Sequence, residues 1–109
     1  MIFSTTQLNT PGASLASDSC VHAITDVTGF GLLGHLLEVC KGSGTAAIIH
    51  TKDLPTLPNV MDYLGQGCVT GATARNWASH ACYVAQNAHW AETPLKTLLT
   101  DPQTSGGLL

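Results

Sequence analysis

Asp26 and Thr28 stand directly ahead of the glycine-rich turn Gly29-Phe30-Gly31, and these residues have the clearest capacity for chemistry in the sequence. Backbone N–H groups at such a turn, and at the start of the helix that follows it, attract phosphate oxygens. A carboxylate beside a phosphate is repelled unless a cation lies between them. Mg²⁺ prefers oxygen ligands and often joins one or two carboxylates to substrate phosphates. One interpretation is therefore that Asp26 is a Mg²⁺ ligand and that Thr28, Gly29 and Gly31 bind a nucleotide or phosphate.

The same segment has two other interpretations. Asp26 or Thr28 could cap the helix that begins near Gly29, a role that requires no ligand. Alternatively, the G-x-G-x-x-G spacing that starts at Gly29, with Asp53 further along, could mark a dinucleotide-binding turn. A dinucleotide-binding strand runs apolar straight into its first glycine, whereas residues 25–28 (TDVT) intervene here. Local chemistry leaves all three interpretations open, and dinucleotide binding is the least favoured.

A second group of hydrogen-bonding residues closes the sequence, in the segment DPQTSGGLL. Pro102 fixes a turn, and Gly106-Gly107 allows another backbone to approach closely. The segment supplies three candidates for a loop beside the site: Asp101, Thr104 and Ser105. Ser105 does not stand in a G-x-S-x-G elbow, so a serine nucleophile is not indicated. We predict no catalytic residue within this chain.

Composition narrows the possible partners. The net charge is −3 and the four basic residues are scattered, which argues against nucleic-acid binding. No apolar run reaches the roughly 20 residues of a membrane helix, and the first residues lack a signal-peptide pattern, so we expect a cytoplasmic protein with no membrane partner. The cysteines and histidines lack the closely spaced pairs typical of zinc sites. Charged residues make up only 10%, which reflects either a Gly-, Ala- and Thr-rich sequence or a surface that another domain or subunit covers.

Periodicity and turn residues predict the elements that hold these segments. The clearest is a helix over Phe30–Lys41, where apolar residues recur at helical spacing before Gly42 and Gly44. Three further helices are predicted, over Val60–Leu64, over Ala74–Ala85 and from Thr93-Pro94 to before Asp101. Three strands are predicted, over Val21–Thr25, over Thr45–His50 and from Gly107. This alternation predicts an α/β or α+β domain, with a small sheet flanked by helices. Because the sequence stops at Gly-Gly-Leu-Leu, we expect the sheet to be truncated at its last strands.

The two segments together resemble the paired signatures of the selenophosphate synthetase (selenide, water dikinase) family. Residues 25–35 (TDVTGFGLLGH) are similar to the first signature and residues 101–109 (DPQTSGGLL) to the second. The segments LPTLP, QGCV and GATARN between them are similar to the family in order and spacing, and the early LN and PGA resemble the helix entrance before the first signature. The resemblance implies the C-terminal domain of the aminoimidazole-ribonucleotide-synthetase-like fold.

The resemblance also implies an activity. Members of the family are ATP-dependent phosphotransferases that make selenophosphate from selenide, ATP and water, and release AMP and phosphate. They use Mg²⁺ and act as homodimers, with the nucleotide between two domains. The aspartate of the first signature, here Asp26, is a metal ligand in the family. The family's N-terminal domain supplies a Cys or selenocysteine, a catalytic Lys and further aspartates, and nothing in this sequence matches them.

These departures lead to expectations for the chain itself. We expect residues 1–20 to be a partial N-terminal segment of the domain and residues 21–109 an incomplete C-terminal domain. The isolated chain is then expected to be inactive without the missing N-terminal domain. A non-enzymatic fragment or scaffold without a ligand is the alternative, and a piece of a dinucleotide-binding oxidoreductase is less favoured.

Overall fold

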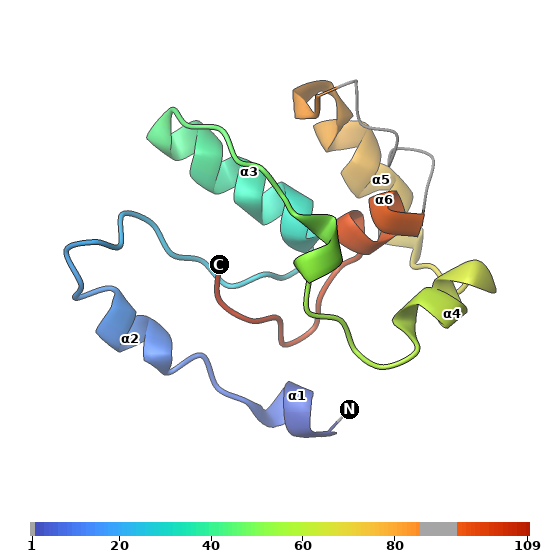
Figure 1. The fold of residues 1–109 in the computed structure, drawn as a ribbon, viewed down its shortest axis with the longest axis horizontal. Helices are drawn as coiled ribbons and strands as arrows, with labels where there is room; N and C mark the ends of the chain where they lie inside the picture. Colours follow the sequence, from blue (N-terminus) through green and yellow to red (C-terminus); the bar gives the residue numbers. More distant parts are fainter. Residues whose placement is uncertain (1, 86–93) are drawn as a thin grey trace.

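The computed structural model describes residues 2–85 and 94–109 of the chain. Its elements follow in the order α1 (Ile2–Thr6), α2 (Pro11–Leu15), α3 (Gly31–Ser43), the 3-10 helix η1 (Thr51–Asp53), α4 (Val60–Gly65), α5 (Gly71–His80), the 3-10 helix η2 (Ala81–Tyr83) and α6 (Pro94–Thr100). The helices α3, α5 and α6 pack against one another, and α4 packs on α6. Figure 1 shows these four helices on one side of the molecule and α1 and α2 on the other side.

Helix α3 confirms the strongest prediction from the sequence. It begins one residue later and ends two residues later than the periodicity predicts, with Leu33 and Cys40 buried. Gly44 ends it in the left-handed conformation, with a φ of 65°, and the Gly44 N–H donates to the Cys40 carbonyl. Glycine adopts this conformation without the strain that a Cβ would cause. Of the two glycines predicted to stop the helix, Gly44 does so, whereas Gly42 lies inside α3.

The core lies where the end of α6 meets the start of α3. Leu99 and Thr100 are almost completely buried, with exposed fractions of 1% and 0%. The buried Thr100 hydroxyl donates to the Lys96 carbonyl at 2.8 Å, so its burial leaves no unpaired donor. Gly31 has a φ of 69°, and a Cβ there would lie 2.8–2.9 Å from backbone atoms of residues 99–101. Only glycine allows the two helices to meet this closely.

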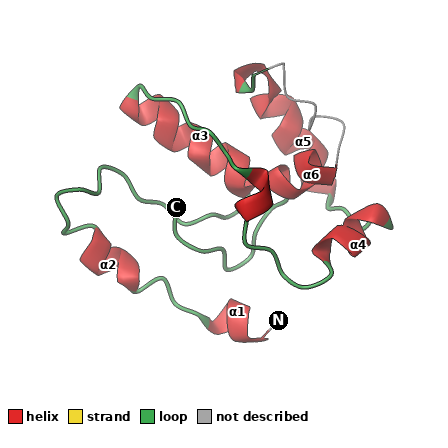
Figure 2. Cartoon of the chain, viewed as in Figure 1, coloured by secondary structure: helices red, strands yellow, loops and turns green. Residues whose placement is uncertain are grey.

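The predicted small sheet is not confirmed. In the described part of the chain the only β pairing is an isolated antiparallel bridge between Asp26 and Leu108, and Figure 2 draws the surrounding segments as loops. Beside the bridge, Thr25 and Leu109 exchange two backbone hydrogen bonds, of 3.0 and 2.8 Å. The predicted strands over 21–25 and 45–50 are not assigned as strands. A strand needs a neighbour to take its backbone N–H and C=O groups, and among residues 2–85 and 94–109 only those near the bridge have one.

Other predicted boundaries shift. The helix predicted over Ala74–Ala85 begins earlier, at Gly71, and ends at His80, after which η2 forms a tighter turn. Pro94 begins α6 as predicted, and the helix ends at Thr100, directly before Asp101; Thr93 lies outside the described residues. The short helix α4 matches its prediction to within one residue.

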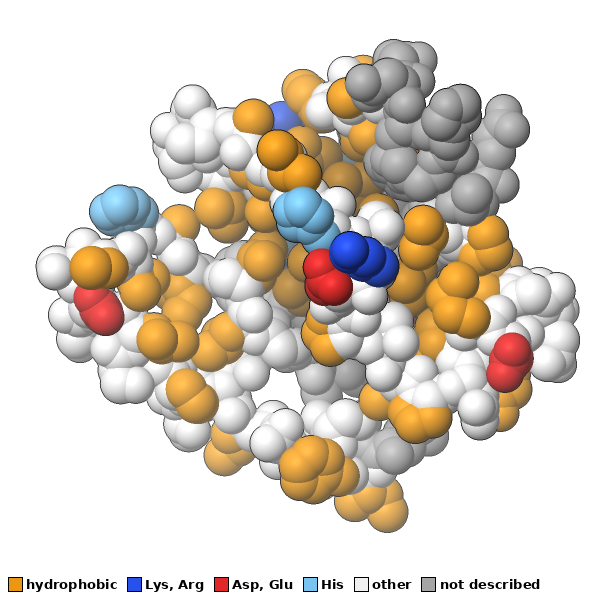
Figure 3. All heavy atoms as spheres, viewed as in Figure 1, with side chains coloured by type: hydrophobic (Ala, Val, Ile, Leu, Met, Phe, Trp, Pro, Cys, Tyr) orange, Lys and Arg blue, Asp and Glu red, His pale blue; other side chains and the backbone are white. Residues whose placement is uncertain are grey.

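The surface of the molecule is poor in charge. Figure 3 shows hydrophobic side chains spread across one face, with few acidic or basic ones among them. The most exposed large apolar side chains are Ile2, Phe3, Leu8 and Ile48, with exposed fractions of 76–87%. Within residues 2–85 and 94–109, no helix combines the length and apolar character needed to cross a membrane.

Candidate functional site

The structure brings the two predicted segments into direct contact. We call residues 25–31 the glycine turn and residues 101–109 the C-terminal segment. Besides the bridge, the Gln103 N–H donates to the Thr28 carbonyl at 2.9 Å, and the Val27 N–H donates to the Gly107 carbonyl at 3.0 Å. A Cβ at Gly106 would overlap the Val27 carbonyl oxygen. The glycine turn thus rests on the C-terminal segment through contacts that bare backbone makes possible.

Asp26 is exposed, whereas its neighbour Val27 is buried, as expected for extended backbone in which successive side chains face opposite ways. No described residue forms a hydrogen bond or ion pair with the Asp26 carboxylate. The residue at the N-cap of α3 is Phe30, and no side chain caps this helix. The capping interpretation therefore finds no support, and the Asp26 carboxylate remains free to meet a cation.

A single free carboxylate fits one kind of metal site and not another. Across the described ranges, no group of three or more His, Cys, Asp or Glu side chains could enclose an ion, so the residues do not fit a closed structural metal site. Mg²⁺ usually keeps several waters and takes only one or two protein carboxylates together with phosphate oxygens. Asp26 fits the role of one ligand in such an open site.

The hydroxyl of Thr28 is held by a histidine. Thr28 Oγ1 lies 3.1 Å from Nε2 of His35, which is buried in α3. Nδ1 of His35 lies 3.2 Å from Glu38 Oε2 but forms no hydrogen bond with any described residue. If Nε2 carries the ring proton, it donates a hydrogen bond to the Thr28 oxygen, and the Thr28 hydroxyl keeps its own proton for another acceptor, such as a phosphate oxygen. The tautomer of His35 therefore decides whether Thr28 can donate outward.

The two glycines of the predicted phosphate site play different parts. Gly31 donates its N–H to the Thr28 carbonyl at 3.1 Å and packs against residues 99–101, so its N–H is not free for a ligand. The N–H groups of Gly29 and Phe30 have no partner among the described residues. Gly29 and Phe30, rather than Gly31, therefore present the donors of the turn.

Asn76 makes two contacts that were not predicted from the sequence. Its side-chain nitrogen donates to the Gly29 carbonyl and to the Thr100 carbonyl, both at 2.9 Å. It lies on α5 and is buried. The available signal was its place in the segment GATARN, which resembles the family in spacing but suggests no role for any single residue.

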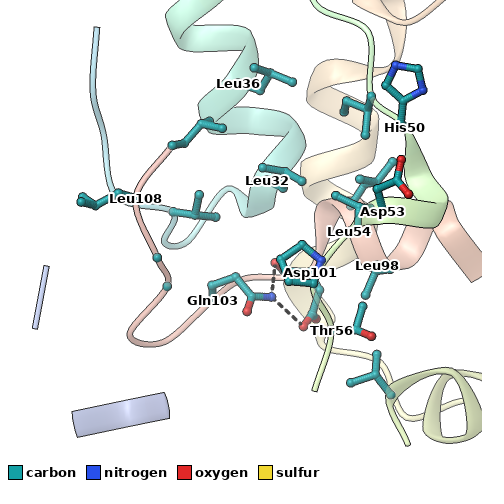
Figure 4. Close-up of a pocket in the computed structure, with 18 of the residues that line it drawn as sticks. Leu32, Leu36, His50, Asp53, Leu54, Thr56, Leu98, Asp101, Gln103 and Leu108 are labelled. Carbon is teal, nitrogen blue, oxygen red and sulfur yellow. Dashed lines mark hydrogen bonds between the residues drawn. The ribbon is translucent and has the colours of Figure 1, made fainter. Parts of the chain in front are cut away.

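Asp101 connects the C-terminal segment to α5. Its Oδ1 accepts from the hydroxyls of Thr70 and Thr73 at 3.3 and 3.4 Å, at the start of that helix. The side-chain amide of Gln103 donates to the Asp101 carbonyl at 3.1 Å and to Oδ2 at 3.4 Å (Figure 4). Thr104 and Ser105 are exposed, and Ser105 has a φ of 60°. Asp101 is thus engaged within the protein, whereas the other two candidates face solvent.

A hollow of about 660 Å³ lies beside this network. Figure 4 shows Leu32, Leu36, Leu54 and Leu98 among its lining residues, together with Asp101. The exposed predicted ligands Asp26, Thr28 and Gly29 do not line it. Asp53, the acid of the dinucleotide interpretation, does line it but ends η1 instead of a strand. This mostly apolar hollow and the free carboxylate of Asp26 are therefore separate features.

Comparison with known proteins identifies a family and several relatives to which this chain is similar. Residues 6–102 match the family model described as AIR synthase related protein, C-terminal domain. The whole chain is 59% identical to a selenide, water dikinase of Dechloromonas aromatica (strain RCB) and 51% identical to one of Paraburkholderia xenovorans (strain LB400). Over 103 residues, 94% of the chain, it is 53% identical to a selenide, water dikinase of Yersinia pestis. The chain spans 28–31% of the length of these relatives. The predicted resemblance is confirmed.

Proposed function

Because the chain belongs to the family of AIR synthase related C-terminal domains and is similar throughout to selenide, water dikinases, we propose that it acts as a domain of such an enzyme. The proposed reaction makes selenophosphate from selenide, ATP and water, with release of AMP and phosphate. By the same similarity we propose a cytoplasmic homodimer that holds ATP between its domains. Since the chain spans about 30% of the relatives, the nucleophile and further metal ligands would come from outside residues 1–109.

The observation that carries this proposal is the free carboxylate of Asp26 beside unpaired backbone donors. Asp26 is exposed and unpaired, and the N–H groups of Gly29 and Phe30 follow three and four residues later without partners in the described structure. Donors and a carboxylate of this kind suit a phosphate group that arrives with a cation. The arrangement therefore favours phosphate chemistry over a purely structural turn.

Each residue of the turn has a part in the proposed mechanism. Asp26 would hold Mg²⁺, which when bound offsets the charge of the ATP phosphates. Gly29 and Phe30 would donate their N–H groups to phosphate oxygens, and Thr28 would add its hydroxyl when His35 carries the proton on Nε2. These groups bind and orient the phosphates. They contain no nucleophile and no general base, so turnover requires the rest of the enzyme.

The proposal can be tested in a chimera. The Dechloromonas aromatica selenide, water dikinase would carry this chain in place of its own 109 matching residues. We expect selenide-dependent formation of AMP from ATP in the chimera, and a large loss of this activity after Asp26→Asn. The matched control is Asp62→Asn, which makes the same change at an exposed position of α4. A folded chimera that forms no AMP with selenide would refute the proposed function.

A further inference from the structure

The Asn76 side chain joins two segments that lie far apart in the sequence. It is buried, with an exposed fraction of 8%, and its nitrogen contacts the carbonyls of Gly29 and Thr100, 47 and 24 residues away. A side-chain amide offers two N–H donors, and these two carbonyls account for both. Asn76 therefore ties the glycine turn to the buried end of α6.

The contact with the Gly29 carbonyl fixes the orientation of the whole Gly29–Phe30 peptide. A trans peptide is planar, so the C=O of Gly29 and the N–H of Phe30 belong to one rigid unit and point in opposite directions. When Asn76 holds the carbonyl on the buried side, the Phe30 N–H must face away from the core. That N–H has no partner among the described residues.

We propose that Asn76 is a positioning residue for phosphate binding, which holds the Gly29–Phe30 peptide so that the Phe30 N–H faces a phosphate of the bound nucleotide. The inference rests on the proposed function, because it assumes that the glycine turn binds ATP. Asn76 does not touch the nucleotide and acts only through the peptide.

Apart from the contact between the Thr28 hydroxyl and His35, the other contacts that hold the turn are made by backbone atoms. The Thr28 carbonyl accepts from the Gln103 N–H, the Val27 N–H donates to Gly107, and Gly31 packs on residues 99–101. These contacts remain when Asn76 is replaced, so the turn keeps its place while the Gly29–Phe30 peptide becomes free to rotate. A defect in binding without loss of the fold is the expected signature.

The test measures MgATP affinity by isothermal titration calorimetry in the chimera described above. Asn76→Asp keeps the shape of the side chain but turns an oxygen toward the two carbonyls, and Asn76→Ser removes the long donor without adding charge. We expect MgATP to bind about tenfold more weakly to Asn76→Ser, the factor that corresponds to about 1.4 kcal/mol, and at least as weakly to Asn76→Asp. The control Asn59→Asp makes the same chemical change at an exposed residue and should leave the affinity unchanged.

The titration also separates positioning from folding. The binding stoichiometry reports the fraction of folded protein, and the dissociation constant reports the site in the molecules that are folded. A lower stoichiometry with an unchanged dissociation constant in both variants would show a purely structural role and would overturn the inference. Affinities of both variants within about twofold of the parent, a difference of about 0.4 kcal/mol, would overturn it as well.

The Asp26→Asn chimera distinguishes this inference from the proposed function. If Asp26→Asn weakens MgATP binding and the Asn76 variants do not, the inference fails and the proposed function stands. If the Asn76 variants weaken binding and Asp26→Asn does not, the positioning role stands and the metal assignment to Asp26 fails.

Discussion

Replacement of Asp26 should affect function strongly and stability weakly, and the structure supplies the reason for both. The carboxylate is exposed and forms no hydrogen bond or ion pair with a described residue, so its loss breaks no such contact in that part of the chain. Exposed substitutions without such contacts usually change the free energy of unfolding by less than about 0.5 kcal/mol. We expect both Asp26→Asn and Asp26→Ala to remain within that limit.

The effect on Mg²⁺ binding follows from the charge that is removed. Two unit charges about 4 Å apart attract by about 1 kcal/mol in water and by about 4 kcal/mol at an effective dielectric constant of about 20. A divalent ion doubles these values, and the exposure of Asp26 places it near the lower one. A loss of about 2 kcal/mol corresponds to roughly thirtyfold weaker binding.

Two measurements on the chimera check the reasoning. Chemical denaturation gives the free energy of unfolding, and calorimetric titration with MgATP gives the affinity, for Asp26→Asn, Asp26→Ala and the control Asp62→Asn. If Asp26 capped α3, the order would reverse: Asp26→Ala would cost about 1 kcal/mol, the usual value of a cap, and the affinity would not change. Unchanged Mg²⁺-dependent affinity in Asp26→Asn would refute the metal assignment.

Three further predictions concern the fold and the isolated chain. Gly31→Ala should lower the free energy of unfolding of the chimera by at least about 2 kcal/mol in denaturant melts, because it combines a positive φ with overlap against residues 99–101. Its control is Gly42→Ala, at a helical position with open space around it, which should raise the free energy of unfolding by no more than about 1 kcal/mol. The purified 109-residue chain should form no AMP from ATP and selenide, since phosphoryl transfer needs several positioned groups together and the glycine turn supplies a single carboxylate, Asp26, with no nucleophile and no general base; a selenide-dependent product in that assay would contradict this. The same chain should self-associate in light scattering, because Ile2, Phe3, Leu8 and Ile48 are largely exposed on a surface with little charge; a single monomeric species at high concentration would show otherwise.

The sequence predicted the parts of the fold that depend on local chemistry. The apolar spacing in α3 and the glycine at its end are properties of neighbouring residues, so the helix and its stop could be predicted. The strands could not, because a run such as residues 45–50 becomes a strand only when another segment pairs with its backbone. Near Thr25 the pairing extends over a single bridge, between Asp26 and Leu108, and no local property of the sequence states how far such pairing extends.

Only part of the candidate site could be predicted, again because local patterns are visible in the sequence and long-range contacts are not. Asp26 stands out because a carboxylate ahead of a glycine-rich turn is a local pattern. Asn76 does not stand out, because its role depends on carbonyls 47 and 24 residues away that meet only in the folded chain. The sequence also suggested equal parts for Gly29 and Gly31, whereas the N–H of Gly31 is already used by the Thr28 carbonyl.

The packing makes the two segments of this chain depend on each other. Gly31 must be a glycine because residues 99–101 leave no space for a Cβ, and Gly106 must be one because the Val27 carbonyl oxygen occupies that space. Each segment thus contains a glycine at which a Cβ would overlap backbone atoms. At Gly106 these atoms belong to the glycine turn, and at Gly31 they belong to residues 99–101, at the start of the C-terminal segment and directly before it. The G-x-G-x-x-G spacing therefore arises here at least partly from the contact between two segments, whereas a dinucleotide-binding turn uses its glycines to admit a pyrophosphate. Because both overlaps would be with backbone atoms, no side-chain substitution in the other segment could relieve them, and the two segments meet in this way only while Gly31 and Gly106 are both glycine.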